Sequence, residues 1–191
     1  MRPINCVISR CRANGTIQAN YRTSYAYNTI FVACGDGTSG HCLLSNVQNE
    51  LAINCTFVNN TVPAGNPNSG SAANLQNCVF IDSTSETYSR TVPKNCVTTK
   101  TASGDRVVST ATENKNKTGA STYQYLSPAA GDWRIVAGAA VIDAGDASFI
   151  SGASSWLPTE YAAVDFYGNP RTSGTIDIGC YEYQKQDMTV R

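Results

Sequence analysis

The chain has 191 residues, and its 14 basic residues balance its 14 acidic residues. This zero net charge argues against nucleic acid and against an anionic membrane surface as partners, because both attract a surplus of basic residues. No apolar run is long enough to cross a membrane, so the sequence predicts no membrane span. Thr, Asn, Ser and Gly are abundant, whereas the helix formers Glu, Lys and Leu are scarce. This composition favours many short strands joined by turns.

A short pattern recurs five times in the first hundred residues. Each copy begins with Asn, continues with Cys or Thr, and has Ile, Phe or Thr at its fourth position; the copies start at Asn5, Asn28, Asn54, Asn77 and Asn95. Alternate residues of a strand share one face, so the second and fourth positions form a compact, mostly apolar face. One such strand cannot bury its face alone, but stacked coils bury it continuously. The repeat therefore predicts an all-β, right-handed parallel β-helix, a solenoid of about five coils over residues 1–100.

The second position of the pattern is a column of interior cysteines. In-register parallel strands hold their side chains parallel, which does not suit a disulfide, so we predict buried thiols here. The cysteines concerned are Cys6, Cys55, Cys78 and Cys96. Cys11 and Cys34 share a different column near a turn, where a disulfide remains an alternative.

The same register predicts contacts between polar side chains on neighbouring coils. The five asparagines form a column that favours a ladder of side-chain amides, each bonded to the next. Asp82 and Lys100 fall side by side in another column. We expect both features to stabilise the stack rather than to bind a ligand.

The cysteines give little support for metal or cofactor chemistry. Cys34, His41, Cys42 and Cys55 could supply four zinc ligands, but no Cys-x-x-Cys pair is present and the repeat explains two of the four. His41 and Cys42 are adjacent, so on a strand they point to opposite faces and do not suit nucleophilic catalysis. We therefore predict no metal and no cofactor.

The repeated pattern ends and the composition of the sequence changes after residue 100. Residues 101–130 predict a polar loop or an irregular coil, and residues 131–191 predict a cap region that covers the last coil. Apolar side chains that could provide this cover are Trp133, Ile135, Val141, Ile142, Ile176 and Ile178. Arg171 is expected to pair with aspartates of the same region, namely Asp143, Asp165 and Asp177. Calcium at these aspartates or Asp146 is the alternative, but EF-hand spacing is absent.

Four ordered motifs in this region resemble a known family. They are Gly131-Asp132-Trp133-Arg134, Val141-Ile142-Asp143-Ala144-Gly145, Asp165-Phe166-Tyr167-Gly168-Asn169-Pro170-Arg171 and Asp177-Ile178-Gly179-Cys180-Tyr181-Glu182. Together they resemble the C-terminal region of bacterial right-handed β-helix repeat proteins of the choice-of-anchor Q type. Ala139-Ala140 and Cys180 depart from that pattern. The resemblance implies a secreted or cell-surface bacterial protein, in a family that also includes polysaccharide-degrading enzymes.

The coils offer no paired carboxylates for catalysis. Their acids are Asp36, Glu50, Asp82 and Glu86, and no two share a column, so we predict no catalytic residue. The expected function is a non-catalytic, adhesin-like scaffold with a glycan as its candidate ligand. Trp156 and Tyr161 are the candidate sugar-stacking residues, followed by Tyr21, Tyr25 and Tyr27. The alternatives are a C-terminal fragment of a β-helical polysaccharide lyase or glycoside hydrolase, and a phage or viral fibre component.

The N-terminal end of the stack predicts a protein partner. Residues 1–10 form a coil strand in this register, with Ile4, Cys6 and Ile8 on the interior face. An open solenoid end exposes apolar side chains and strand edges. We therefore expect another chain, or further coils preceding Met1, to cover this end.

Overall fold

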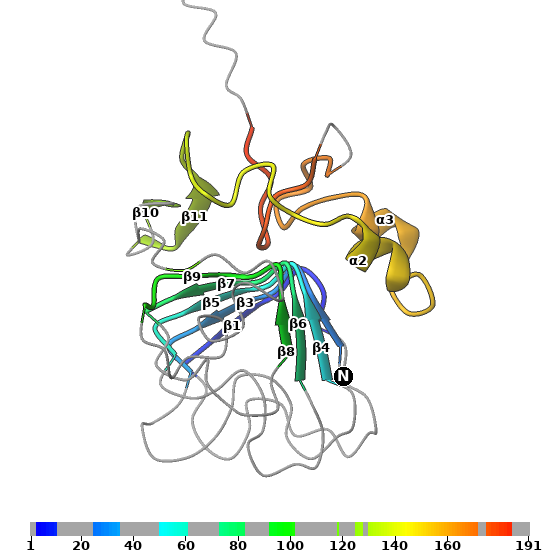
Figure 1. Cartoon of the computed structure of the whole chain (residues 1–191), viewed down its shortest axis with the longest axis horizontal. Helices are drawn as coiled ribbons and strands as arrows, with labels where there is room; N and C mark the ends of the chain where they lie inside the picture. Colours follow the sequence, from blue (N-terminus) through cyan, green and yellow to red (C-terminus); the bar gives the residue numbers. More distant parts are fainter. Residues whose placement is uncertain are drawn as a thin grey trace, which may run out of the picture.

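The computed structural model describes residues 3–10, 25–34, 50–60, 73–82, 92–101, 118, 125–127, 130–171 and 175–184. Nine of the described strands form two parallel sheets that meet at a bend (Figure 1). The first sheet has the order β1 (Val7–Ser9), β3 (Ile30–Val32), β5 (Thr56–Val58), β7 (Val79–Ile81) and β9 (Val97–Thr98). The second has the order β2 (Tyr25–Tyr27), β4 (Glu50–Ile53), β6 (Ala73–Gln76) and β8 (Val92–Lys94).

Successive strands alternate between the two sheets, and each strand pairs in parallel with the strand two places further along the chain. The chain therefore winds as a parallel β-helix, which confirms the fold class predicted from the repeat. None of the helices in the described part of the chain is long and apolar enough to span a membrane.

The five repeated asparagines form the bend between the sheets. All have left-handed backbone conformations, with φ between 47° and 52°. Asn adopts this region more readily than most residues because its short side chain bonds locally. A second left-handed column follows the strands of the first sheet, at Arg10, Ala33, Asn59 and Asp82. Each coil thus turns at two fixed points, which keeps the strands in register.

The interior of the coils contains the residues that the repeat predicted. Phe31, Phe57 and Phe80 stack face to face, with ring centroids 4.8 and 4.7 Å apart. Cys55, Cys78 and Cys96 are fully buried in the same cluster. All cysteines within the described residues are reduced thiols: Cys6, Cys34, Cys55, Cys78, Cys96 and Cys180. The alternative of a disulfide between Cys11 and Cys34 involves Cys11, which lies outside the described residues together with Cys42.

The first coil corrects one predicted orientation. Ile8 packs against the interior cluster of the coils. Ile4 instead pairs with Tyr27 and packs against a second cluster, which contains Tyr27, Ile53, Ala153 and Leu157. The left-handed Asn5 bends the chain between Ile4 and Cys6, so the alternation of a straight strand does not continue across it.

The polar columns also differ from the prediction. Within the described residues, the amide ladder has one rung, from Asn95 Nδ2 to Asn77 Oδ1 at 2.9 Å. Asn28, Asn77 and Asn95 also bind the C-terminal region. Asp82 exchanges hydrogen bonds with Thr99, and no ion pair between Asp82 and Lys100 occurs among the described residues.

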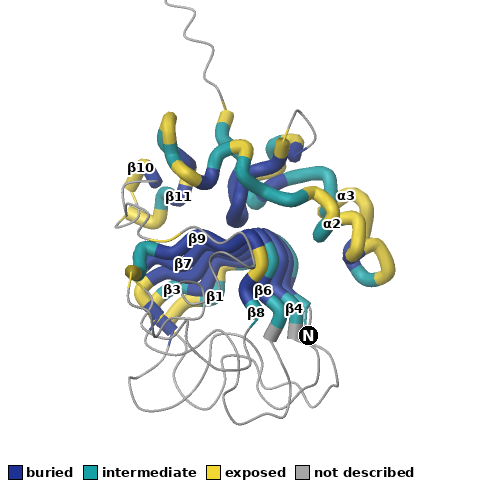
Figure 2. Tube along the Cα trace, in the orientation of Figure 1, coloured by how far each residue is buried: buried dark blue, intermediate teal, exposed yellow. Residues whose placement is uncertain are grey.

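The C-terminal region lies along the outside of the bend (Figures 1 and 2). It contains the antiparallel strands β10 (Tyr125–Ser127) and β11 (Asp132–Ile135) and the short helices α2 (Ser148–Gly152) and α3 (Thr159–Ala162). β10 falls within the predicted loop, most of which lies outside the described residues. Outward side chains of the first sheet are buried beneath this region: Ile30, Val58, Val79, Ile81 and Val97.

Contacts of this region with the bend extend over four coils. Val164, Cys180, Asp146 and Ala144 contact, in that order, Asn28, Thr56, Asn77 and Asn95. The region is therefore a cover along the flank of the stack, and its described contacts are not confined to the last coil. The reason lies in the first sheet, whose outward residues are as apolar as its inward ones and need burial too.

Two asparagines of the bend provide a matched test of this attachment. Asn77 accepts hydrogen bonds from Asp146 N and Asn95 Nδ2 and donates one to Asp146 O. The buried amide of Asn54 has no hydrogen-bond partner among the described residues. Gly tolerates the left-handed backbone at both positions. We expect Asn77→Gly to lower the free energy of unfolding by about 2 kcal/mol more than Asn54→Gly, because only Asn77 loses bonds. Equal losses in urea unfolding would contradict this role.

Candidate functional site

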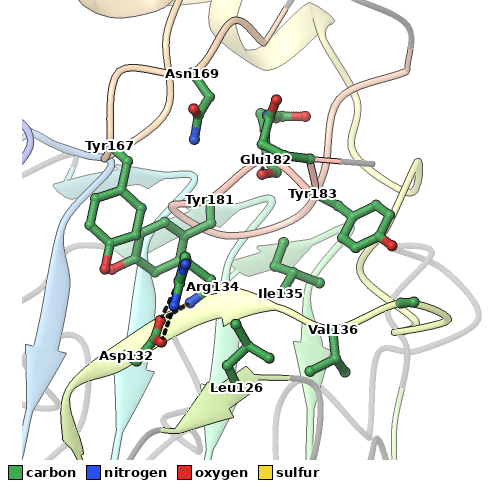
Figure 3. Close-up of a pocket in the computed structure, with 12 residues that line it drawn as sticks. Leu126, Asp132, Arg134, Ile135, Val136, Tyr167, Asn169, Tyr181, Glu182 and Tyr183 are labelled. Carbon is green, nitrogen blue, oxygen red and sulfur yellow. Dashed lines mark hydrogen bonds and ion pairs between the residues drawn. The ribbon is translucent and has the colours of Figure 1, made fainter. Parts of the chain in front are cut away.

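A half-open groove of about 870 Å³ lies between the β10–β11 pair and the C-terminal loops (Figure 3). This volume is in the upper part of the range of about 300–1,000 Å³ that is usual for ligand sites. One wall is formed by Leu126, Asp132, Arg134 and Ile135, and the other by Tyr167, Tyr181, Glu182 and Tyr183. The site thus belongs to the cover, and the coils support it from below.

Two stacked tyrosines form an aromatic platform in the groove. The rings of Tyr167 and Tyr181 have centroids 4.8 Å apart and planes inclined by 28°. Phe166 packs edge-on against both. Tyr181 is buried, and burial raises the pKa of its hydroxyl, whereas Tyr167 is 51% exposed. Packing therefore fixes the ring of Tyr181. The ring of Tyr167 is held in place by its stack on Tyr181 and leaves an exposed aromatic surface that a ligand could contact.

A tight turn holds Tyr167 in this position. The buried Asp165 accepts hydrogen bonds at Oδ1 from the backbone N–H groups of Tyr167 and Asn169, both at 2.8 Å. Its Oδ2 accepts from Asn169 Nδ2 and Glu182 N. Gly168 supplies the left-handed residue of the turn, with φ of 86°. The motif Asp165–Arg171 therefore builds the turn, with Asp165 as an acceptor for backbone groups.

The facing wall carries an ion pair. Arg134 donates from Nε to Asp132 Oδ1 at 2.9 Å and from Nη2 to Asp132 Oδ2 at 2.7 Å. The two residues are two apart on β11, so their side chains share one face. The Arg134 guanidinium holds the pKa of Asp132 below its usual range. This ion pair of Asp132 and Arg134, which we call the fork, presents a carboxylate and a guanidinium side by side at the rim of the groove.

A buried ion pair lies beneath the groove. Arg171 Nη1 donates to Glu182 Oε1 at 2.5 Å, and its Nη2 donates to Asn28 Oδ1 and Gly179 O. The side chains of Arg171 and Glu182 are 1% and 9% exposed. Glu182 also accepts from Asp177 N. The pair therefore connects the groove to the bend of the β-helix.

This arrangement corrects the predicted partner of Arg171. Its ion-pair partner is Glu182, and not an aspartate. Asp165 and Asp177 instead accept hydrogen bonds from backbone N–H groups. No group of three or more metal-ligating side chains occurs among the residues with described positions.

Burial should make the stability of the cover depend on pH. It raises the pKa of Glu182 to about 7 from an ordinary value of 4.5, against the opposing attraction of Arg171. The folded chain then binds more protons than the unfolded chain between these values, so stability falls as pH rises through 7. We expect the free energy of unfolding to be about 1–3 kcal/mol higher at pH 5 than at pH 8. In urea titrations, Glu182→Gln should reduce this difference; an unchanged difference would contradict the assignment.

The residues predicted to stack on sugars lie elsewhere. Trp156 is half-buried and stacks on Tyr25, with centroids 4.5 Å apart, in the cluster beneath α2 and α3. Tyr161 lies on α3 and is 40% exposed. Tyr27 is buried and donates from its hydroxyl to Ala162 O. None of these four lines the groove, and Tyr21 lies outside the described residues.

Sequence reasoning missed the groove, although it singled out three motifs that form it. Gly131–Arg134 supplies residues of one wall, and Asp165–Arg171 and Asp177–Glu182 supply residues of the other. Their place among the four motifs of the resemblance was the available signal, but it did not indicate that they face each other. His41, Asp36 and Glu86, and the side chain of Glu50, lie outside the described part of the chain.

Comparisons of the chain with protein-family models, with curated proteins and with solved structures gave no match. The function of the groove is therefore argued from its own geometry.

Proposed function

We propose that the chain is a non-catalytic, adhesin-like β-helix scaffold that binds a glycan in the groove of its cover. The observation that carries this proposal is the half-exposed ring of Tyr167, held in a stack and facing a fork of charged groups. The C–H face of a pyranose is attracted to the negative face of an aromatic ring. Its hydroxyls can donate to Asp132 and accept from Arg134 in charge-assisted hydrogen bonds.

The proposal places the protein outside a bacterial cell, secreted or on the surface. The four C-terminal motifs that resemble choice-of-anchor Q proteins support this placement. The reduced cysteines are compatible with an oxidising compartment, because the interior of the coils shields Cys55, Cys78 and Cys96 from oxidants. A rigid stack beneath the groove would hold its walls at a fixed separation, which favours binding of an extended ligand.

Tyr167 should dominate binding. We expect Tyr167→Ala to weaken binding of the best ligand on a glycan array by at least tenfold, because stacking area is lost at an exposed ring. The measurement is a titration of that ligand by calorimetry, with circular dichroism to verify folding.

Tyr161→Ala is the matched control. This tyrosine is similarly exposed, but it lies on α3 outside the groove, so its loss should leave the affinity unchanged. An affinity that falls with Tyr161 and not with Tyr167 would move the site to α3 and refute the proposal for the groove.

One observation favours glycoside hydrolysis as a second candidate function. Asp132 and Glu182 line the same groove, and their pKa values are shifted in opposite directions. Carboxyl groups shifted in this way can act as base and acid in glycosidases. Both are engaged, however: Asp132 with Arg134, and Glu182 with Arg171. Release of reducing ends from a bound glycan, abolished by Asp132→Asn and by Glu182→Gln, would establish hydrolysis in place of binding alone.

A further inference from the structure

The described cations of the groove are already neutralised. Arg134 is the one basic side chain among the described residues that line it, and both oxygens of Asp132 bind its guanidinium. Arg171 lies behind the lining and is paired with Glu182. Each of these two positive charges therefore has its own carboxylate within hydrogen-bond distance.

An anionic ligand would meet two obstacles in this arrangement. To bind Arg134 with its own carboxylate or sulfate, it would have to displace Asp132 from a bidentate pair on the same strand. It would also gain no unpaired cation on the opposite wall, because Glu182 there is already paired with Arg171. A neutral hydroxyl meets neither obstacle, because it can bridge the fork while the ion pair remains intact.

We infer that the groove selects glycans built from uncharged sugars and excludes chains that carry uronate or sulfate groups. This inference rests on the proposed glycan-binding function and specifies its ligand class. Selection follows from Asp132, whose carboxylate cancels the charge of Arg134 at the rim. The aromatic platform supplies affinity for either class, since stacking on Tyr167 does not depend on ligand charge.

The experiment titrates the full chain with two panels at low salt. One panel contains neutral glucans, mannans, galactans and xylans, and the other contains polygalacturonate, alginate and heparin. The chain should bind at least one neutral polymer at least tenfold more tightly than any acidic one. Asp132→Asn keeps the shape of the side chain but leaves Arg134 without its counter-charge. This variant should gain at least fivefold in affinity for the acidic panel, and the gain should disappear at high salt.

The outcomes separate the inference from the function on which it rests. Tighter binding of an acidic polymer by the parent chain, reduced by Tyr167→Ala, would overturn the inference and retain a glycan-binding groove. The inference would also be overturned, and the glycan-binding groove retained, if Asp132→Asn gained no affinity for acidic polymers while the parent chain bound neutral ones. Absence of binding to both panels would overturn the proposed function itself.

Discussion

Replacing Arg171 by alanine should lower the free energy of unfolding by about 3–5 kcal/mol at pH 8, because it leaves the carboxylate of Glu182 buried without its partner. Asn28 Oδ1 and Gly179 O lose a donor in the same variant. Urea unfolding followed by circular dichroism measures the loss. The expected result identifies Arg171 as the residue that attaches the cover to the bend of the second coil.

Two variants test this interpretation of Arg171. Arg171→Met combined with Glu182→Gln removes both charges of the pair, so it should recover part of the stability lost in Arg171→Ala. Arg134→Ala breaks the exposed pair with Asp132 and should change stability little, because water and salt screen exposed pairs. If Arg171→Ala unfolded at the same urea concentration as the parent, the attachment would not depend on this pair.

Replacing Phe57 by alanine should destabilise the fold by about 3–5 kcal/mol, because it opens a cavity in the middle of the aromatic stack. Phe57 is 1% exposed and lies between Phe31 and Phe80, so neighbouring rings on both sides lose contact at once. Thermal and urea unfolding both report the change. Phe57→Leu should lose less, since it retains most of the buried volume.

Val7→Ala is the control for position in the coil. Val7 is on the outward face of β1 and is 54% exposed, so its truncation should have little effect. Equal losses at Phe57 and Val7 would mean that the stacked rings do not determine the stability of the coils.

The coils could be predicted from the sequence because the residues that form their bends and their interior recur in a repeated pattern. The asparagine at the start of each repeat marks a left-handed bend, and Phe31, Phe57 and Phe80 follow at a constant distance from it. The same reasoning placed Ile4 inside, because it treated Ile4 and Cys6 as neighbours on a straight strand. The bend at Asn5 lies between them and ends the alternation.

The cover and its groove could not be predicted in this way. Their contacts join residues with no common period: Arg171 reaches Asn28 across 143 positions, and Thr56 reaches Cys180 across 124. The apolar outward residues Ile30 and Val79 indicated that a second layer was needed, but they did not specify which segment supplies it. The partner of Arg171 was missed because two aspartates, Asp165 and Asp177, lie closer to it in the chain than Glu182 does.

Because the cover runs along the flank of the stack, it affects how this β-helix folds. In an ordinary repeat array each coil touches only its neighbours, so folding can spread step by step and ends can fray independently. Here the second and fifth coils bind the same continuous segment, at Val164 and Ala144. That segment is translated after all five coils, and its contacts give the chain a high contact order. The outer faces of the coils therefore stay exposed to water until residues 144–164 have been synthesised, and the coils and the cover should unfold as one cooperative unit.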